Sequence, residues 1–161
     1  MKLAGDLVIR EATNKDIEGI IEVLKTIYLQ DVAWAERAIK KLLATENYVI
    51  LVAELDDQVV GFIDYYILPS IWEKRNEATI NNFFIHKDYQ GKGVGSRLLE
   101  EVIKRTDEIG IVELHVGTEK KNERAIRLYK KHGFLTEYLL LERVRTPFQK
   151  KYKCRGIVLP R

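Results

Sequence analysis

The sequence contains little cysteine and no long apolar run, and each shortage excludes a class of protein. Its single Cys154 cannot form a disulfide within the chain, and one thiol cannot build a metal site of several cysteines. No stretch approaches the roughly 18 apolar residues that a membrane-spanning helix needs. The N-terminal residues lack the apolar core of a signal peptide. We therefore expect a cytoplasmic protein with no membrane partner.

What the sequence does contain is the composition of a folded domain. Of its 161 residues, 46% are hydrophobic and 32% are charged, which excludes a disordered or collagen-like chain. Chains of this length usually form one domain with one core. We therefore expect a single domain over residues 1–161.

The charged residues are unevenly distributed, because the C-terminal end is basic. From Arg143 onward there are seven basic residues and no acid, whereas the rest of the chain carries 20 basic and 24 acidic residues. A basic tail can meet an anionic ligand or another chain, but a solvated terminal segment is the simpler expectation. Only Phe148 and Tyr152 accompany these positive charges, and this pattern does not favour nucleic acid as a partner.

Hydrophobic spacing predicts an alternation of strands and helices. Ile17, Ile20 and Ile21 begin a series at intervals of three and four, which is typical of an amphipathic helix. Two apolar runs around a polar turn favour a hairpin. Together the elements predict a mixed α/β architecture, one layer of sheet with helices packed against it. The expected strands are 7–13, 48–54, 59–66, 79–86, 111–116 and 134–143, and the expected helices are 17–28, 32–44, 94–109 and 122–132.

A cluster of glycines between an expected strand and an expected helix is the most informative segment. Gln90-Gly91-Lys92-Gly93-Val94-Gly95-Ser96 holds three glycines within five residues. Such a density costs chain entropy unless the backbone must approach something closely. The first amides of the following helix have no partner within that helix, and the helix dipole favours an anion there. The segment is a candidate phosphate-binding loop, with a tight turn that binds nothing as the alternative.

Two common phosphate-binding patterns do not fit this loop. A P-loop ends in Gly-Lys-Ser or Gly-Lys-Thr, but here Gly95 is followed by Ser96 and Arg97. The dinucleotide pattern G-x-G-x-x-G fits at Gly91 and Gly93 but meets Ser96 where its third glycine should stand. The loop therefore needs another explanation.

Two motifs, in this order, resemble the signatures of a known family. The first is Ile85-x-x-x-x-Gln90-x-x-Gly93-x-Gly95, and the second is Asn122-x-x-Ala125-x-x-Leu128-Tyr129-x-x-x-Gly133-Phe134. Together they are similar to the acetyl-CoA signatures of the GNAT superfamily of N-acetyltransferases. The resemblance covers about residues 7–142 and implies a mixed, largely antiparallel sheet of six to seven strands flanked by about four helices. A candidate for the family's last strand is Ile157-Val158-Leu159.

The resemblance also implies which residues bind acetyl-CoA as co-substrate. The loop amides would hold its diphosphate, because glycines remove the side chains that block its approach. By register from Gln90, the amide of Phe83 would bind the thioester oxygen as charge develops on it, and the backbone of Ile85 would pair with the pantetheine arm. The full expected set is Phe83, Ile85, Gln90, Gly91, Lys92, Gly93, Val94, Gly95, Ser96, Asn122, Ala125 and Tyr129.

The transfer that the resemblance implies, direct attack of a primary amine through a tetrahedral intermediate, needs an acid and a base. Tyr129 stands at the family's tyrosine position, and a tyrosine hydroxyl can protonate the departing thiolate. Some members carry a glutamate on the fourth strand where this chain has Thr79. The candidate bases are, in order, His115, Glu113 and Glu77, with solvent-facing strand polarity as the alternative for each. No cluster shows metal-ligand spacing, so we expect no metal.

The sequence does not specify the acceptor amine. Three possibilities stay open: an enzyme for a small amine with a closed pocket, a peptide N-terminal or lysine acetyltransferase with an open groove, and a non-catalytic acyl-CoA-binding module. The oligomeric state, a homodimer included, is open too. An acid in the acceptor groove would suit a cationic amine. The candidate groove residues are Tyr28, Trp34, Asp64, Tyr65, Tyr66 and Trp72.

Overall fold

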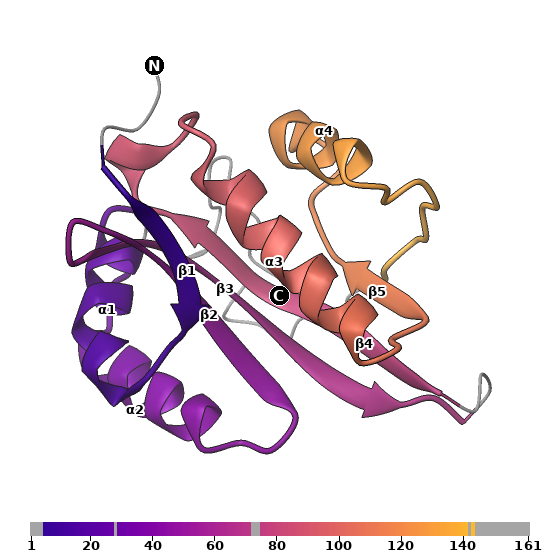
Figure 1. The fold of residues 1–161 in the computed structure, drawn as a ribbon, viewed down its shortest axis with the longest axis horizontal. Coiled ribbons are helices and arrows are strands. Elements are labelled where there is room, and N and C mark those ends of the chain that lie inside the picture. Colours follow the sequence, from indigo (N-terminus) through magenta and orange to yellow (C-terminus); the bar gives the residue numbers. More distant parts are fainter. Residues whose placement is uncertain (1–4, 28, 72–74, 142, 144–161) are drawn as a thin grey trace.

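The computed structural model describes residues 5–27, 29–71, 75–141 and 143, which fold around one mixed sheet (Figure 1). The strand order is β1-β2-β3-β4-β5; the first four strands pair antiparallel, and β5 pairs parallel to β4. Two short 3-10 helices, η1 (Asn14–Asp16) and η2 (Lys87–Tyr89), precede α1 and the glycine loop. The strands are β1 (Leu7–Glu11), β2 (Tyr48–Leu55), β3 (Gln58–Pro69), β4 (Asn76–Ile85) and β5 (Glu113–Val116), and the helices are α1 (Ile17–Lys25), α2 (Val32–Leu43), α3 (Val94–Glu108) and α4 (Glu123–Lys131).

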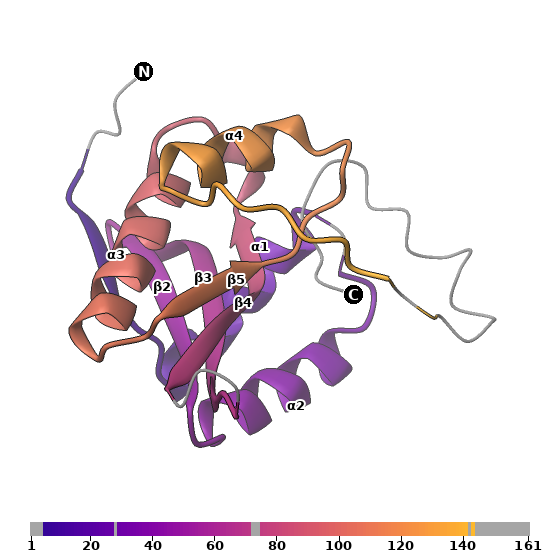
Figure 2. The same cartoon turned by 90° about the vertical axis from the view of Figure 1, so that its right-hand side faces the viewer.

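Helices cover both faces of the sheet, and alternation along the strands sends side chains to each face (Figure 2). On the α1–α2 face, Ile20 of α1 packs in one core cluster with Phe62 and Phe84. On the α3–α4 face, Leu98 of α3 packs in a second cluster with Ile63. Each helix buries one apolar stripe, which is why the spacing of three and four predicted them. None of the helices in the described ranges is long and apolar enough to cross a membrane.

An irregularity in β4 shapes the centre of the molecule. Opposite β3, the residue Asn81 is extra between the pairs Asp64–Asn82 and Tyr65–Ile80, which makes a β-bulge. On its other side, β4 pairs with β5 only as far as Ile80. The bulge therefore falls where β5 leaves β4, and beyond it that edge of β4 has no strand neighbour within the described ranges.

The predicted order of elements is confirmed as far as α4, but the strand expected at 134–143 is wrong for the residues that the structure describes. Residues 134–141 form no regular structure, and Leu139 and Leu141 are more than four-fifths exposed. Because strand preference comes largely from packing, an apolar run that is mostly exposed and pairs with no strand in the described part of the chain does not order as a strand. The described part therefore has five strands rather than six to seven. The candidate last strand at 157–159 lies outside the described residues.

Candidate functional site

An open pocket of about 350 Å³ lies on the α3–α4 face. Figures 1 and 2 both place α4 beside the first half of α3, and a 3.2 Å contact between His132 Nε2 and Glu100 Oε1 joins the two segments. All the residues expected to bind acetyl-CoA line this pocket, except Lys92 and Val94. The lining residues are Phe83, Ile85, Tyr89, Gln90, Gly91, Gly93, Gly95, Ser96, Asn122, Arg124, Ala125, Leu128 and Tyr129.

The glycine loop presents main-chain groups to this pocket. Gly91 and Gly93 have φ angles of 76° and 92°, a left-handed conformation that costs other residues free energy. Gly93 is the N-cap of α3, and no side chain caps the helix there. A Cβ atom on Gly93 would meet nothing within 4 Å, so this position faces open space. The first amides of α3 and the helix dipole therefore form a site suited to an anion.

Gln90 connects the loop to the end of β4 and to α4. It donates a hydrogen bond from Nε2 to the carbonyl oxygen of Ile85 at 3.1 Å and accepts one at Oε1 from Arg124 at 3.1 Å. The guanidinium of Arg124 thus adds a positive charge beside the loop amides. The sequence analysis missed Arg124, although its place in the second motif, two residues after the N-cap Asn122, was an available signal.

The side chains of two residues of the expected set do not line the pocket. The Lys92 ammonium lies 5.3 Å from the ring centroid of Tyr89, which is a cation–π contact. Val94 is 1% exposed and packs in the core of the α3–α4 face. Only the main chain of Val94 can therefore serve an anion at the start of α3.

The main chain of β4 directs two amides toward its free edge. Successive N–H groups along a strand point to opposite edges. The amide of His86 donates to a carbonyl of β3 at 2.9 Å, and the amide of Asn82 donates to the Asp64 carboxylate of β3, also at 2.9 Å. The amides of Phe83 and Ile85 therefore point away from β3, toward the edge that β5 has left.

Tyr129 closes the inner end of the pocket. It is 4% exposed, and its ring centroid lies 6.4 Å from that of Phe83 and 5.7 Å from that of Phe134. Its buried hydroxyl has no hydrogen-bond partner in the described part of the chain. Burial raises the pKa of this hydroxyl, so it keeps its proton at neutral pH. A buried hydroxyl without a partner costs about 1–3 kcal/mol, which a ligand that accepts its proton would offset.

The opposite face of the sheet is polar near the point where β4 and β5 part. Asp64 is 2% exposed and accepts hydrogen bonds from the Tyr48 hydroxyl at 2.8 Å, the Asn82 amide at 2.9 Å and Asn82 Nδ2 at 2.8 Å. Asn81 Nδ2 donates to the Tyr48 hydroxyl at 2.9 Å. Burial raises the pKa of the Asp64 carboxyl to about 6, and the hydrogen bonds oppose this shift. Because the Asp64 carboxylate is this deeply buried, it accepts hydrogen bonds from the neighbouring strands and does not line an open groove.

The three candidate bases lie together on this α1–α2 face. Glu77 of β4 pairs in register with Glu113 of β5, and Thr79 pairs with His115. His115 Nε2 lies 3.2 Å from Glu113 Oε2 and 3.9 Å from Glu77 Oε2. One ligand atom of each lies within 4.8 Å of the others, a spacing that could hold a metal ion. Sequence spacing could not indicate this cluster, because Glu77 is far from the other two along the chain.

The remaining groove candidates divide between the two faces. Tyr66 lies on the α1–α2 face, where its ring stacks at 6.3 Å on a tyrosine of β2, and Trp34 at the start of α2 is 63% exposed. Tyr65 packs in the core of the α3–α4 face, so the expectation that it lines the same groove as Tyr66 is wrong. Neighbours along a strand point to opposite faces. Tyr28 and Trp72 lie outside the described residues.

Comparisons with known proteins agree with this geometry. An uncharacterized N-acetyltransferase of Methanocaldococcus jannaschii is 32% identical over 137 residues, which cover 78% of this chain but only 59% of that protein. The thialysine N-epsilon-acetyltransferase of Bos taurus is 30% identical over 142 residues, 79% of this chain and 83% of that one. The crystal structure of a transcriptional regulator from Bacillus halodurans C-125 superposes with a TM-score of 0.79 at 26% identity, covering 87% of this chain and 100% of the other.

The glycine loop, β4 and α4 also fall within one family model. The model of the acetyltransferase (GNAT) family matches residues 17–134, which contain every residue that lines the pocket. The match extends over well more than half of the 161 residues. The chain therefore belongs to the acetyltransferase (GNAT) family.

Proposed function

We propose that this protein is an acetyl-CoA-dependent N-acetyltransferase that acts on a small primary amine. The proposal rests on one observation: the buried Tyr129 hydroxyl, without a partner among the described residues, lies at the pocket lined by the glycine loop and the free end of β4. These features supply an anion site, main-chain donors and a proton donor in one place. Membership of the family supports the same activity.

The co-substrate would bind chiefly through main-chain groups. The amides at the start of α3 would hold the diphosphate, with Arg124 adding a positive charge beside them. The backbone of Ile85 would pair with the pantetheine arm as an added strand would. The amide of Phe83 would then donate to the thioester oxygen. Because these donors are fixed by the strand and the helix, they need no reorganisation when charge develops.

Transfer would proceed by attack of the neutral amine nitrogen on the thioester carbon. As the C–N bond forms, the carbonyl oxygen takes up negative charge, which the Phe83 amide stabilises. The C–S bond then breaks, and the Tyr129 hydroxyl gives its proton to the departing sulfur. The proton that the amine loses passes to a base on the other face of the sheet, and solvent restores the tyrosine proton after release.

The acceptor would approach from the α1–α2 face, through the gap between β4 and β5. There His115 and Glu113 are the proposed bases, in that order, and Glu77 lies beside them. Glu77 and Glu113 stand directly opposite each other on neighbouring strands, an arrangement in which like charges destabilise a sheet. A cationic amine between them would offset this repulsion. The name of the bovine relative, which acts on the Nε amine of thialysine, agrees with a small cationic acceptor.

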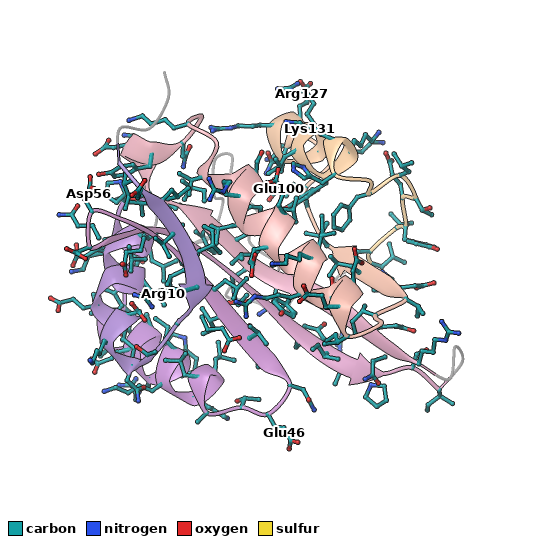
Figure 3. The ribbon with its side chains drawn as sticks, viewed as in Figure 1. Arg10, Glu46, Asp56, Glu100, Arg127 and Lys131 are labelled. Carbon is teal, nitrogen blue, oxygen red and sulfur yellow. The ribbon has the colours of Figure 1, made fainter. Side chains whose placement is uncertain are left out.

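The experiment is a thiol-release assay with acetyl-CoA and a panel of diamines, polyamines, basic amino acids, aminoglycosides and peptides. We expect release with small cationic amines. The double variant Glu77→Gln with Glu113→Gln should raise the KM of the best diamine about tenfold, because each of the two lost ion pairs at these partly exposed carboxylates is worth up to about 1 kcal/mol. Glu46→Gln is the matched control, since Glu46 is exposed in the loop before β2 (Figure 3).

Three outcomes would overturn parts of this proposal. Release with peptides alone would replace the small amine by a peptide N-terminal or lysine substrate. Binding of acetyl-CoA without release in the presence of any amine would identify a non-catalytic acyl-CoA-binding module. The Glu77→Gln and Glu113→Gln double variant with an unchanged KM would remove the two carboxylates from the acceptor site.

A further inference from the structure

Asp64 is an unusual residue for the middle of a sheet. Its carboxylate is 2% exposed, and the groups that donate to it within the described part of the chain are neutral: the Tyr48 hydroxyl, and the main-chain amide and side-chain amide of Asn82. A buried carboxylate without a cationic partner is costly, since water is replaced by only a few hydrogen bonds. The neighbours of Asp64 on this face, such as Phe62 and Phe84, are apolar. A charged group at this position therefore reduces the stability of the sheet.

The carboxylate lies beneath the bulge of β4. In a regular antiparallel pair, a main-chain carbonyl of β3 would accept the hydrogen bond of the Asn82 amide. At the bulge, Asp64 Oδ1 accepts a hydrogen bond from this amide at 2.9 Å. Because amides alternate along a strand, the direction of the Asn82 amide decides the direction of the next one, that of Phe83. The bulge is also where β5 leaves β4, so no ladder to β5 can fix this direction.

We propose that Asp64 is a positioning residue for acetyl transfer: by accepting the hydrogen bond of the Asn82 amide, it turns the Phe83 amide into the gap between β4 and β5. The inference rests on the proposed function, in which the Phe83 amide binds the thioester oxygen. Asp64 itself would touch neither substrate, since it is 2% exposed on the face that the acceptor approaches and does not line the pocket on the other face. The main-chain hydrogen bond is what matters, and the charge of the carboxylate is not needed for it.

Two substitutions at Asp64 separate this role from a role of the charge. Asp64→Leu keeps the branched shape of the side chain but has no acceptor, so the Asn82 amide loses this partner and the bulge relaxes. Asp64→Asn keeps an Oδ1 that accepts the same hydrogen bond, and Asn82 can rotate its own amide to complement the new one. We expect kcat to fall about thirtyfold in the Leu variant and less than about fivefold in the Asn variant, because a misdirected oxyanion donor costs 10²–10³ at most. The KM for acetyl-CoA should change less than about threefold in both.

Thr106→Val is the matched control, because Thr106 is also 2% exposed and polar but lies in α3 and hydrogen-bonds within its own helix. It should keep the wild-type kcat. Wild-type kcat in Asp64→Leu would overturn the proposal. An Asn variant as slow as the Leu variant would overturn it too, since the charge would then be the essential property.

A second measurement does not depend on turnover or on the folding of a variant. Amide hydrogen exchange of the wild-type protein, followed by NMR, should show a strongly protected Asn82 amide and a Phe83 amide that exchanges at least about a hundredfold faster. Equal exchange of the two amides would overturn the proposal even in an active enzyme. Conversely, this pattern in a protein that transfers no acetyl group would leave the positioning of the amide intact and refute the proposed function alone.

Discussion

The two faces of the sheet are built in different ways. On the α3–α4 face, the pocket is lined by two short stretches of chain, 83–96 and 122–129, and offers mainly backbone amides, glycines and one buried hydroxyl. On the α1–α2 face, polar side chains of four strands, β2 to β5, meet through the register of the sheet. A site made of main chain leaves a local motif in the sequence, whereas a site made by register leaves none. The two faces share β4, whose bulge lies between them.

The largest expected effect follows from removing the proposed proton donor on the α3–α4 face. Tyr129→Phe should lower kcat by about 10²-fold or more, as expected for loss of a general acid, while the Kd of acetyl-CoA changes less than about threefold. The free energy of unfolding should not fall, because the hydroxyl has no partner to lose within the described part of the chain. Rapid-mixing kinetics under single-turnover conditions measure the chemical step.

Tyr65→Phe is the control for this experiment, since Tyr65 is buried on the same face but does not line the pocket. It should leave kcat unchanged. If the two phenylalanine variants behave alike, Tyr129 is a packing residue and the acid must be sought elsewhere.

On the α1–α2 face, the buried Asp64 should make the protein's free energy of unfolding depend on pH. Burial raises the pKa of the Asp64 carboxyl from its ordinary value of 3.8 to about 6, so the folded state binds a proton more readily than the unfolded state between these values. The free energy of unfolding should therefore fall as the pH rises from about 4 to about 6, by about 2–3 kcal/mol at most from this group, given 1.36 kcal/mol per pKa unit.

Asp64→Asn removes this titration, so the difference in stability between wild type and variant reports the contribution of Asp64 separately from that of other titratable groups. Arg10 lowers the pKa of Asp16, so that ion pair loses stability as the pH falls, the opposite sign, but it contributes equally to both proteins. Denaturant titrations at several pH values give the difference between wild type and variant. A difference that does not change with pH would mean that Asp64 titrates in the folded protein as it does in the unfolded chain.

The proposed phosphate-binding role of the glycine loop on the α3–α4 face can be tested by introducing a bulky side chain there. Gly93→Val should weaken binding of acetyl-CoA about thirtyfold, because the new side chain enters the open space before α3 and because a φ of 92° strains any branched residue. Isothermal titration calorimetry measures the Kd.

Gly110→Val is the control, because it introduces the same kind of backbone strain at a position away from the proposed phosphate site. Gly110 has a φ of 73°, and a Cβ there also meets nothing within 4 Å, but it follows the other end of α3. Its Kd should equal that of the wild type. An equal loss of affinity in both variants would show that backbone strain, and not the phosphate site, explains the result.

The smallest expected effect concerns Arg124. Arg124→Ala should weaken binding of acetyl-CoA about fivefold at low salt and less at high salt, since a partly exposed charge is screened. The control is Arg127→Ala on the same helix, whose side chain projects outward and pairs only with Glu123 among the described residues (Figure 3). Calorimetry at two ionic strengths would contradict the assignment if the two variants lost affinity equally.

The sequence predicted the α3–α4 face in detail because its features are local. Glycine spacing marked the loop, Asn122 marked the start of α4, and helical spacing placed Ala125 and Tyr129 on one side. Arg124 was missed although its place in the second motif was an available signal, because its contact with Gln90 became visible only in the structure.

The α1–α2 face could not be predicted to the same degree. The sequence named Glu77, Glu113 and His115, but their contact depends on the parallel register of β4 and β5, which a single sequence does not specify. The bulge at Asn81 also has no local signature in the sequence. Because the proposed role of Asp64 depends on this bulge, the sequence could not indicate that role either. The strand expected at 134–143 was wrong because apolar content alone predicted it, without the packing that a strand needs.

We propose above that the amide of Phe83, turned into the gap between β4 and β5, binds the thioester oxygen of acetyl-CoA. The decisive experiment is a crystal structure of the wild-type protein with acetyl-CoA, or with an analogue in which a methylene group replaces the thioester sulfur. We predict that the carbonyl oxygen lies about 2.7–3.1 Å from the Phe83 nitrogen, with the diphosphate at the start of α3. A carbonyl oxygen bound by any other donor, with the Phe83 amide facing β3, would contradict this account.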